Sequence, residues 1–474
     1  MKSDQLSRRK FLQFGIGAVP MLMIPAAIAA TGHVQASASK VVHPNVEITM
    51  DAGVGHAAIL DGTPTKVWRY RGHLVRGRAN ALTPGDRNSY PGPVLRLRPG
   101  DHFRAHITNH LTEATTVHWH GLHVPSEMDG QPRLPIAPGA AFTADFIVKD
   151  RPGIYWYHPH PHGPDGGRTG FQVYHGLAGL LIIDSPEEAS LGLPSGEQDL
   201  PLVIQDRRFD SDNQLVYLAQ GMQGMRERMM GFLGDRIVVN GKVDHRLDVA
   251  TKPYRLRLLN GSNSRIYKLA WSDGRPMTVL GVQGGLLARP IKRPYLTLAP
   301  AERIDLWVDF SHSPVGDNLR LVSHEFKAGM MAGMMTRGSD GKSGGMMSGM
   351  MGNGMMGAEV ASKLPLGSAF DVMAFHVDRH EKHAFKLPDR LVAAPALTVR
   401  DAKNRNQPRR FELTMRMMQG LINGRRFDGT HVADDEVVDL NSVEVWEFDN
   451  RSMLPHPMHV HGLQFLVLQR SQDR

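Results

Sequence analysis

The sequence has 474 residues, 41% of them hydrophobic, and a formal net charge of +8. This length is too great for one compact core and suggests two to four domains. The basic residues are scattered along the chain, so the charge does not indicate nucleic-acid binding. The sequence contains no cysteine, which excludes both disulfide bonds and thiolate metal ligands.

Residues 1–38 have the pattern of an export signal. Residues 7–12 read SRRKFL, a twin-arginine pattern, and an apolar stretch follows from about residue 14 to 30. Small-residue cleavage sites come next. The apolar stretch is short and contains two prolines, which favours a cleaved signal peptide over a lone membrane anchor. We therefore expect export by the twin-arginine machinery to a bacterial periplasm, with no stable membrane span.

Strand-like segments between turns cluster into a first region (42–185), a second region (195–380) and a third region (408–474), with 381–407 as the linker between the last two. In each region an alternating strand ends in asparagine, at Asn109, Asn260 and Asn450. Histidines stand nine and eleven residues after the first and third of these asparagines, whereas Leu269 and Trp271 hold those places in the second region. The repeat predicts three related β-domains, with a metal site shared by the first and third.

Residues 329–357 contain ten methionines set among Gly and Ser. Such residues cannot build a packed core alone, so we expect a loop inserted in the second region. Thioether sulfur is a soft ligand that selects Cu(I), which favours copper capture over a low-complexity insert without function.

Three histidine runs carry the chemistry: HWHG at 118–121, YHPH at 157–160 and HPMHVHG at 456–462. Residues i and i+2 of a strand point to one face, so each H-x-H pair can direct two imidazoles at one point. Pro159 and Pro161 favour a sheet edge or a loop for the second run. The pairs predict a polynuclear metal site formed by His118, His120, His158, His160, His459 and His461.

Copper is the metal that these residues favour. Six imidazoles are too many for one zinc ion, no catalytic carboxylate of a hydrolase motif lies beside them, and the methionines select Cu(I). A zinc hydrolase is the alternative metalloenzyme. We expect His123 and His162 to lie outside the ligand set, whereas His456 is placed to serve a separate metal.

HWHGLHVP, GIYWYHPHPHG followed by GLAGLLII, ING at 422–424 and HPMHVHG occur in the order typical of bacterial three-domain multicopper oxidases. From about residue 45 onward the chain resembles this family, in particular its laccase-like members and the periplasmic cuprous oxidases of copper tolerance. The resemblance implies an all-β fold of three cupredoxin-like Greek-key β-barrel domains, the third incomplete. It also implies a monomeric oxidoreductase that oxidises Cu(I) or small phenolic donors and reduces O2 to water.

The resemblance implies copper ligands that are all histidines: His118 and His459 for type 2 copper, His120, His158, His160 and His461 for type 3 copper, and His456 for type 1 copper. It also matches Asp129 to an acidic catalytic residue that assists the protonation of reduced oxygen. The alternative for Asp129 is an ordinary turn residue within EMDGQP.

The family's fourth motif, HCHxxxHxxxxM, is missing, and the sequence ends at Arg474. That motif supplies the type 1 cysteine and two further type 3 histidines. We therefore expect a C-terminally truncated chain with an incomplete type 1 site, a partly encoded type 2 and type 3 cluster, and impaired activity. Residues 451–455 also lack the acidic residue of the cuprous oxidases, which favours a general laccase-like protein.

Two other functions stay open at this point. One is a non-catalytic periplasmic copper-binding protein of copper tolerance. The other is a copper-free scaffold of the same fold, as in the cell-division relatives of the family.

Overall fold

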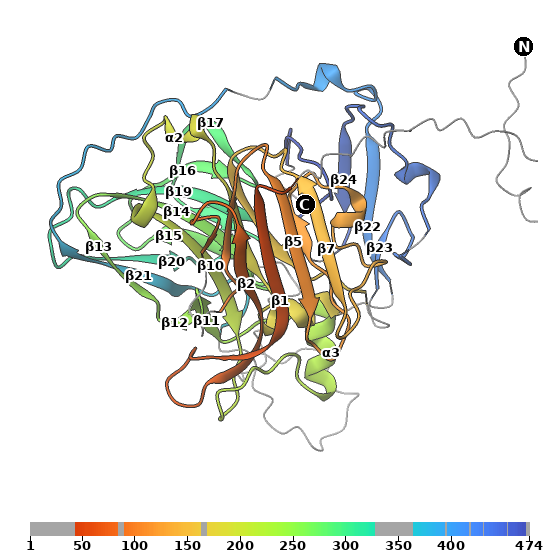
Figure 1. Cartoon of the computed structure of the whole chain (residues 1–474), viewed down its shortest axis with the longest axis horizontal. Coiled ribbons are helices and arrows are strands. Elements are labelled where there is room, and N and C mark those ends of the chain that lie inside the picture. The colour runs from red at the N-terminus through yellow and green to blue at the C-terminus, as the bar shows by residue number, and fades with distance from the viewer. Residues whose placement is uncertain are drawn as a thin grey trace, which may run out of the picture. The chain divides into compact units, whose positions relative to one another are not determined.

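The computed structural model describes residues 43–83, 90–162, 168–327, 364–393, 396–416, 419–429, 431–452 and 454–470. The expected signal peptide and the methionine-rich insert lie outside these residues. The regular structure of the described residues is mostly strand, with few helices (Figure 1), which confirms the all-β prediction. The boundaries of the three regions remain predictions.

The first region contains two sheets around one core. The first sheet runs, in spatial order, β2 (Thr65–Arg76), β1 (Val46–Ala57), β5 (His102–Asn109) and β7 (Ala141–Ile147). The second runs β3 (Leu82–Thr83), β4 (Val94–Leu97), β9 (Gly179–Ile183), β8 (Gly153–His158) and β6 (His118–His120). Burial alternates along β5, so Phe103 faces the core and meets Trp119 of β6. The core thus fixes the strand that carries the first histidine pair.

The second region also contains two sheets. The larger runs β12 (Lys242–Val243), β11 (Arg236–Val239), β10 (Asp199–Arg207), β14 (Pro253–Asn260), β19 (Arg303–Asp309), β16 (Met277–Val282) and β17 (Gly285–Arg293). The smaller runs β13 (Arg246–Ala250), β21 (Phe370–Arg379), β20 (Asn318–Ser323), β15 (Tyr267–Trp271) and β18 (Leu296–Leu298). Leu269 and Trp271, at the repeat positions of the histidines, are buried in the core of this region.

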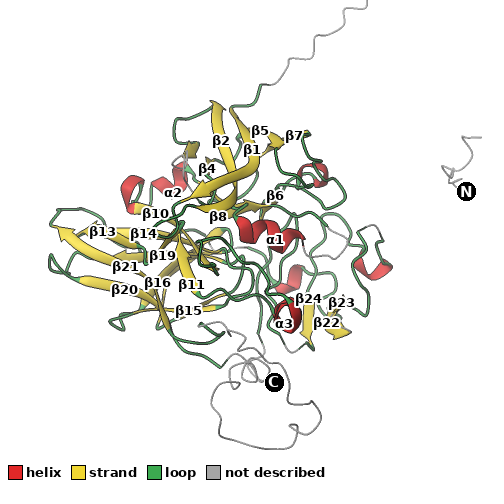
Figure 2. Ribbon diagram, turned by 90° about the horizontal axis from the view of Figure 1, so that it is seen from below, coloured by secondary structure: helices red, strands yellow, loops and turns green. Residues whose placement is uncertain are grey.

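The third region contributes one described sheet in the order β23 (Gln419–Ile422), β22 (Arg409–Arg416) and β24 (Trp446–Asn450). The described helices lie in connections between strands (Figure 2): α1 (Arg168–His175), α2 (Pro186–Ala189) and α3 (Gly221–Met230). None of the helices among the described residues is long and apolar enough to cross a membrane.

The internal repeat is visible in the backbone. A parallel pair of strands recurs in each region, as β1 with β5, β10 with β14 and β22 with β24. Asn109, Asn260 and Asn450 end the second strand of each pair, and each side chain accepts a hydrogen bond from the backbone N–H two residues further on. Each Nδ2 also donates to a carbonyl four or five residues on. The asparagines therefore stabilise the same turn three times.

Ion pairs at Asp199 join β4 of the first region to β10 and β14 of the second region. Arg257 donates to Asp199 at 2.7 Å, and Arg96 of β4 donates to the same carboxylate at 2.9 Å. Burial alone would raise the pKa of Asp199, but the two guanidinium groups lower it to about 2. Asp199 is therefore a carboxylate that neutralises a buried arginine.

Replacing Asp199 by alanine should lower the free energy of unfolding by about 3 kcal/mol, because the buried Arg257 loses its nearest carboxylate and keeps only carboxylates at 3.5–4.0 Å. Chemical denaturation monitored by circular dichroism measures this. The control is Asp248→Ala, which removes the exposed pair with Arg246 and should cost less than about 1 kcal/mol. Equal costs for the two variants would contradict the structural role given to Asp199.

Candidate metal centre

Strand pairing brings the first two histidine runs together. In the antiparallel pair of β6 and β8, His118 lies opposite His158 and His120 opposite Trp156. His118, His120 and His158 are buried. The expectation of an edge or loop for the second run is correct only from Pro159 onward. β8 pairs on both sides, with β9 and β6, and ends at His158, so the proline removes no hydrogen bond from the sheet.

The third run reaches the same place without being a strand. The His459 ring stacks on the His120 ring at a centroid distance of 3.8 Å, and the His461 ring stacks on the His118 ring at 4.0 Å. Residues 456–462 have no strand partner among the described residues, so the strand expected for this H-x-H pair is wrong. The two rings are positioned instead by their contacts with β6.

We call His118, His120, His158, His160, His459 and His461 the histidine cluster. Their rings form a continuous set of contacts, with His160 lying 5.3 Å from His461 and 5.8 Å from His118 between ring centroids. Two groups of three place their ligand nitrogens within 4.8 Å of one another: His118, His459 and His461, and His118, His120 and His158. His118 belongs to both groups and lies where they meet, and its one free nitrogen, Nε2, can bind a single metal ion.

The other candidate histidines lie apart from the histidine cluster. His456 is exposed, and its Nε2 lies 2.8 Å from the Ser452 hydroxyl. His162 packs its ring edge against Phe427. His123 forms a hydrogen bond with the carboxylate of Asp150.

Asp129 orients two of the imidazoles. It follows a short 3-10 turn, Ser126–Met128, and is buried. Its Oδ1 lies 2.9 Å from His118 Nδ1 and its Oδ2 lies 3.0 Å from His461 Nδ1. Each ring thereby donates from Nδ1 and keeps Nε2 free as a ligand. The next residue must be glycine, because Gly130 has φ +63° and a Cβ there would lie 2.3 Å from the Val117 carbonyl oxygen.

The electrostatics of the histidine cluster favour neutral imidazoles. Burial lowers the pKa of His118, lowers that of His120 and His158 well below the ordinary value, and lowers that of His160 to about 4, with mutual repulsion adding to the effect. Burial raises the pKa of Asp129, but His118 and His461 more than offset this and hold it as a carboxylate. Neutral imidazole is the form that binds a metal.

The residues of the histidine cluster fit copper ions. The donor set is imidazole, which suits copper, and the buried His160 Nδ1 has no hydrogen-bond partner in the described part of the chain. A type 1 centre does not fit these residues, because such a site needs a thiolate and the sequence has no cysteine. No step is therefore assigned to a type 1 copper.

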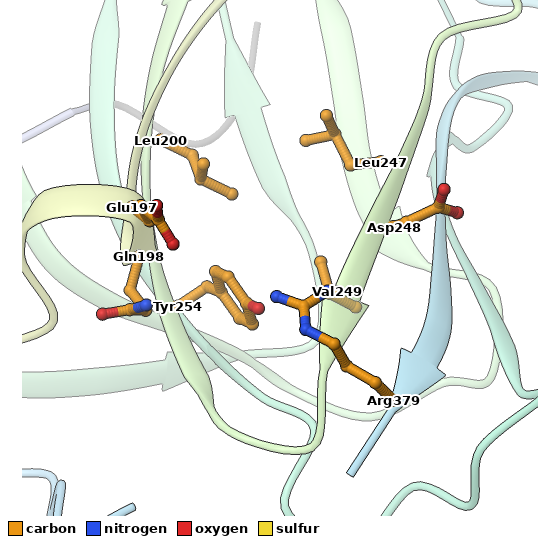
Figure 3. A pocket seen from close by; sticks show the side chains of 8 residues that line it. All are labelled: Glu197, Gln198, Leu200, Leu247, Asp248, Val249, Tyr254 and Arg379. Atoms are coloured by element: carbon orange, nitrogen blue, oxygen red, sulfur yellow. The ribbon is translucent and has the colours of Figure 1, made fainter. Parts of the chain in front are cut away.

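A small cavity in the second region, of about 180 Å³, is unrelated to the histidine cluster (Figure 3). Figure 3 shows Arg379 beside Val249 and Tyr254 in a lining that contains no imidazole. The candidate site is therefore the histidine cluster and not this cavity.

The pair of His123 with Asp150 should make stability depend on pH. The hydrogen bond to the Asp150 carboxylate raises the pKa of His123, so the folded state favours the protonated ring. The resulting stabilisation is complete below the unfolded-state pKa of about 6.5 and is lost as pH rises through the higher folded-state pKa. The loss of unfolding free energy in His123→Ala should therefore be larger at about pH 5.5 than at about pH 9. Equal losses at both pH values would contradict this.

Comparisons with known proteins agree with this site. Two family models, each described as "Multicopper oxidase", match residues 77–188 and residues 400–474. The multicopper oxidase mco of Staphylococcus haemolyticus is 30% identical over 395 residues, which cover 81% of this chain and 71% of that protein. The crystal structure of McoA multicopper oxidase from Aquifex aeolicus is 32% identical, with a TM-score of 0.69, over 91% of this chain and 84% of that one. The cell division protein FtsP of Escherichia coli is 32% identical over 68% of this chain and 63% of its own length.

These likenesses cover both sequence and fold, and they extend over most of the chain and of its relatives. The cupredoxin-like fold expected from the sequence is confirmed by the solved structures. The chain therefore belongs to the multicopper oxidase family, whose members are copper-binding oxidoreductases, and by this resemblance it is an oxidoreductase.

Proposed function

We propose that this chain takes electrons from Cu(I) or a small phenolic donor and reduces O2 to water at the histidine cluster. The observation that carries the proposal is the convergence of six imidazoles from three separate runs, with His118 common to two groups of three. Copper held there would accept single electrons and deliver them to O2. We assign the ligands as the family resemblance implies: His118 and His459 to type 2 copper, and His120, His158, His160 and His461 to type 3 copper.

In this proposal Asp129 acts as a positioning residue. Its hydrogen bonds to Nδ1 of His118 and His461 fix the tautomer and direction of both rings. The burial of Trp156 against His120 and His158 keeps water from one side of the site. A direct role of Asp129 in protonating reduced oxygen remains a prediction.

The methionines of α3 support Cu(I) as a donor. Met222 and Met225 are 68% and 55% exposed, although methionine is usually buried. Met229 stands four residues after Met225, so the three side chains share one face of the helix. The exposed thioethers of Met222 and Met225, with the half-buried one of Met229 beside them, offer Cu(I) the soft ligands that it prefers.

The triple variant Met222→Leu, Met225→Leu, Met229→Leu should raise KM for Cu(I) several-fold and leave oxidation of a phenolic donor unchanged. Leucine keeps the size and helix propensity of methionine but removes the sulfur. Oxygen uptake with Cu(I) and with 2,6-dimethoxyphenol measures both reactions on the copper-loaded chain. Equal effects on the two donors would rule out a Cu(I)-specific role of α3.

A non-catalytic copper-binding protein of copper tolerance is the second candidate, because the imidazoles of the histidine cluster and the exposed methionines of α3 could hold copper without turnover. It predicts retained copper without oxygen uptake from any donor. A copper-free scaffold predicts no retained copper. Oxygen uptake with either donor would exclude both alternatives.

We also propose that the protein is a monomer exported to the periplasm by the twin-arginine machinery. The SRRKFL pattern at residues 7–12 supports the export route. Arg8→Lys, Arg9→Lys should leave the protein in the cytoplasmic fraction of a bacterial host. Unchanged periplasmic recovery would contradict this route.

A further inference from the structure

A larger cavity, of about 450 Å³, lies in the second region between its seven-stranded sheet and residues 385–387. Thr278 of β16 and Trp307 of β19 form part of one wall, and Phe385 and Leu387 form part of the other. Cavities of this size are typical of small-molecule sites. The cavity therefore has room for a ligand with one or two rings.

The wall formed by residues 385–387 is held in place on both sides. The Ser311 hydroxyl lies 2.6 Å from His383 Nε2, and the Leu391 N–H donates to the Ala288 carbonyl at 2.9 Å. Between these points Phe385 and Leu387 pack against a buried cluster that includes Trp307. The cavity is thus a built feature of the fold.

The lining carries more positive than negative charge. Three cations, Arg275, Lys292 and Lys386, face one carboxylate, Asp309. Arg275 is paired with Asp273 at 2.6 Å, and the Asp309 carboxylate accepts hydrogen bonds from Ser311. In the described part of the chain, neither lysine ammonium forms an ion pair. Two positive charges therefore remain for a ligand.

The smaller cavity, shown in Figure 3, has no unpaired cation among the described residues of its lining. Its arginine, Arg379, already pairs with Asp378 at 2.8 Å and with Glu381 at 2.6 Å. Its volume, about 180 Å³, is also less than half that of the larger cavity. The smaller cavity offers no unpaired cation for an anion, whereas the larger one does.

We propose that the larger cavity binds a small aromatic anion, such as an aromatic carboxylate. The ring would pack against Trp307 and Phe385, because aromatic side chains favour stacked or edge contacts with other rings. The acid group would face Lys292 and Lys386. No imidazole lines this cavity, so the site is separate from the histidine cluster and does not depend on copper.

The test is isothermal titration of the full chain with 2-naphthoate, which has no phenolic hydroxyl and so is not a candidate donor for the proposed oxidase. The double variant Lys292→Glu, Lys386→Glu should weaken binding by about tenfold or more, because two attractions become repulsions. The matched control is Lys66→Glu, Lys242→Glu, which changes the net charge equally at exposed lysines outside the cavity and should leave affinity within about twofold.

Two comparison ligands test separately the negative charge and the aromatic ring that the proposal requires of the ligand. The neutral 2-naphthamide lacks the charge, and cyclohexanecarboxylate lacks the aromatic ring; both should bind more weakly than 2-naphthoate. Added salt should weaken 2-naphthoate binding, since the lysines are exposed. No binding of 2-naphthoate, or equal affinity in the two double variants, would overturn the proposal. The copper content of the variants should equal that of the unmodified chain.

Discussion

Replacing His118 by alanine should remove the copper that we assign to His118 and His459. Without His118 that copper keeps a single imidazole from the histidine cluster, whereas the four imidazoles assigned to type 3 copper remain. The affinity should fall by more than the roughly 10–100-fold that loss of an outer hydrogen-bond partner of a ligand costs. Copper per chain, measured by plasma mass spectrometry after gel filtration, gives the result directly.

His456→Ala is the matched control for this experiment. His456 belongs to the same run as His459 and His461, but it is exposed and its ring contacts none of the histidine cluster among the described residues. Its replacement should leave the copper of the cluster in place. If His118→Ala retained as much copper as His456→Ala, the assignment of His118 as a copper ligand would be wrong.

Replacing Asp129 by alanine should have the second largest effect. Both Nδ1 atoms that it holds would lose their acceptor, and the two rings would be free to turn or to change tautomer. We expect copper affinity or turnover to fall about 10–100-fold, as for outer partners of metal ligands elsewhere. Asp129→Asn should be intermediate, because an amide presents one acceptor oxygen but turns a donating NH2 group toward the second imidazole.

A general loss of stability must be separated from this effect. Asp101→Ala provides the comparison, because Asp101 is equally buried and its carboxylate is paired with Arg78 at 2.9 Å, while it touches no member of the histidine cluster. It should lower the free energy of unfolding and leave copper affinity unchanged. Copper affinity that is the same in Asp129→Ala and the unmodified chain would contradict the positioning role.

The sequence predicts which histidines form the cluster better than it predicts the backbone conformation of the segments that carry them. Alternation along a strand correctly paired His118 with His120, because β6 is a strand. The same rule failed for His459 and His461, which lie in a segment without strand hydrogen bonds among the described residues. The i, i+2 spacing of two histidines shows only that their rings can point in the same direction if the segment is a strand. Whether a partner strand is present is a property of the tertiary fold.

Contacts between residues far apart in the sequence could not be predicted from the sequence. Asp129 was singled out only by resemblance, since a turn aspartate followed by glycine is common, and its contact with His461 spans 332 residues. The buried pair of Asp199 with Arg257 and the positive cavity at Lys292 and Lys386 likewise depend on which strands become neighbours. The asparagine repeat can be read from the sequence because each asparagine forms its hydrogen bonds within its own turn.

X-ray diffraction from copper-loaded crystals at energies just above and below the copper absorption edge tests the central claim most directly. It locates copper without relying on activity or on knowledge of the donor. We predict more than one copper peak among His118, His120, His158, His160, His459 and His461, with at least one peak within bonding distance of His118 Nε2. Copper found only at methionines or at His456, with none in the histidine cluster, would contradict the assignment of this cluster as a polynuclear copper site.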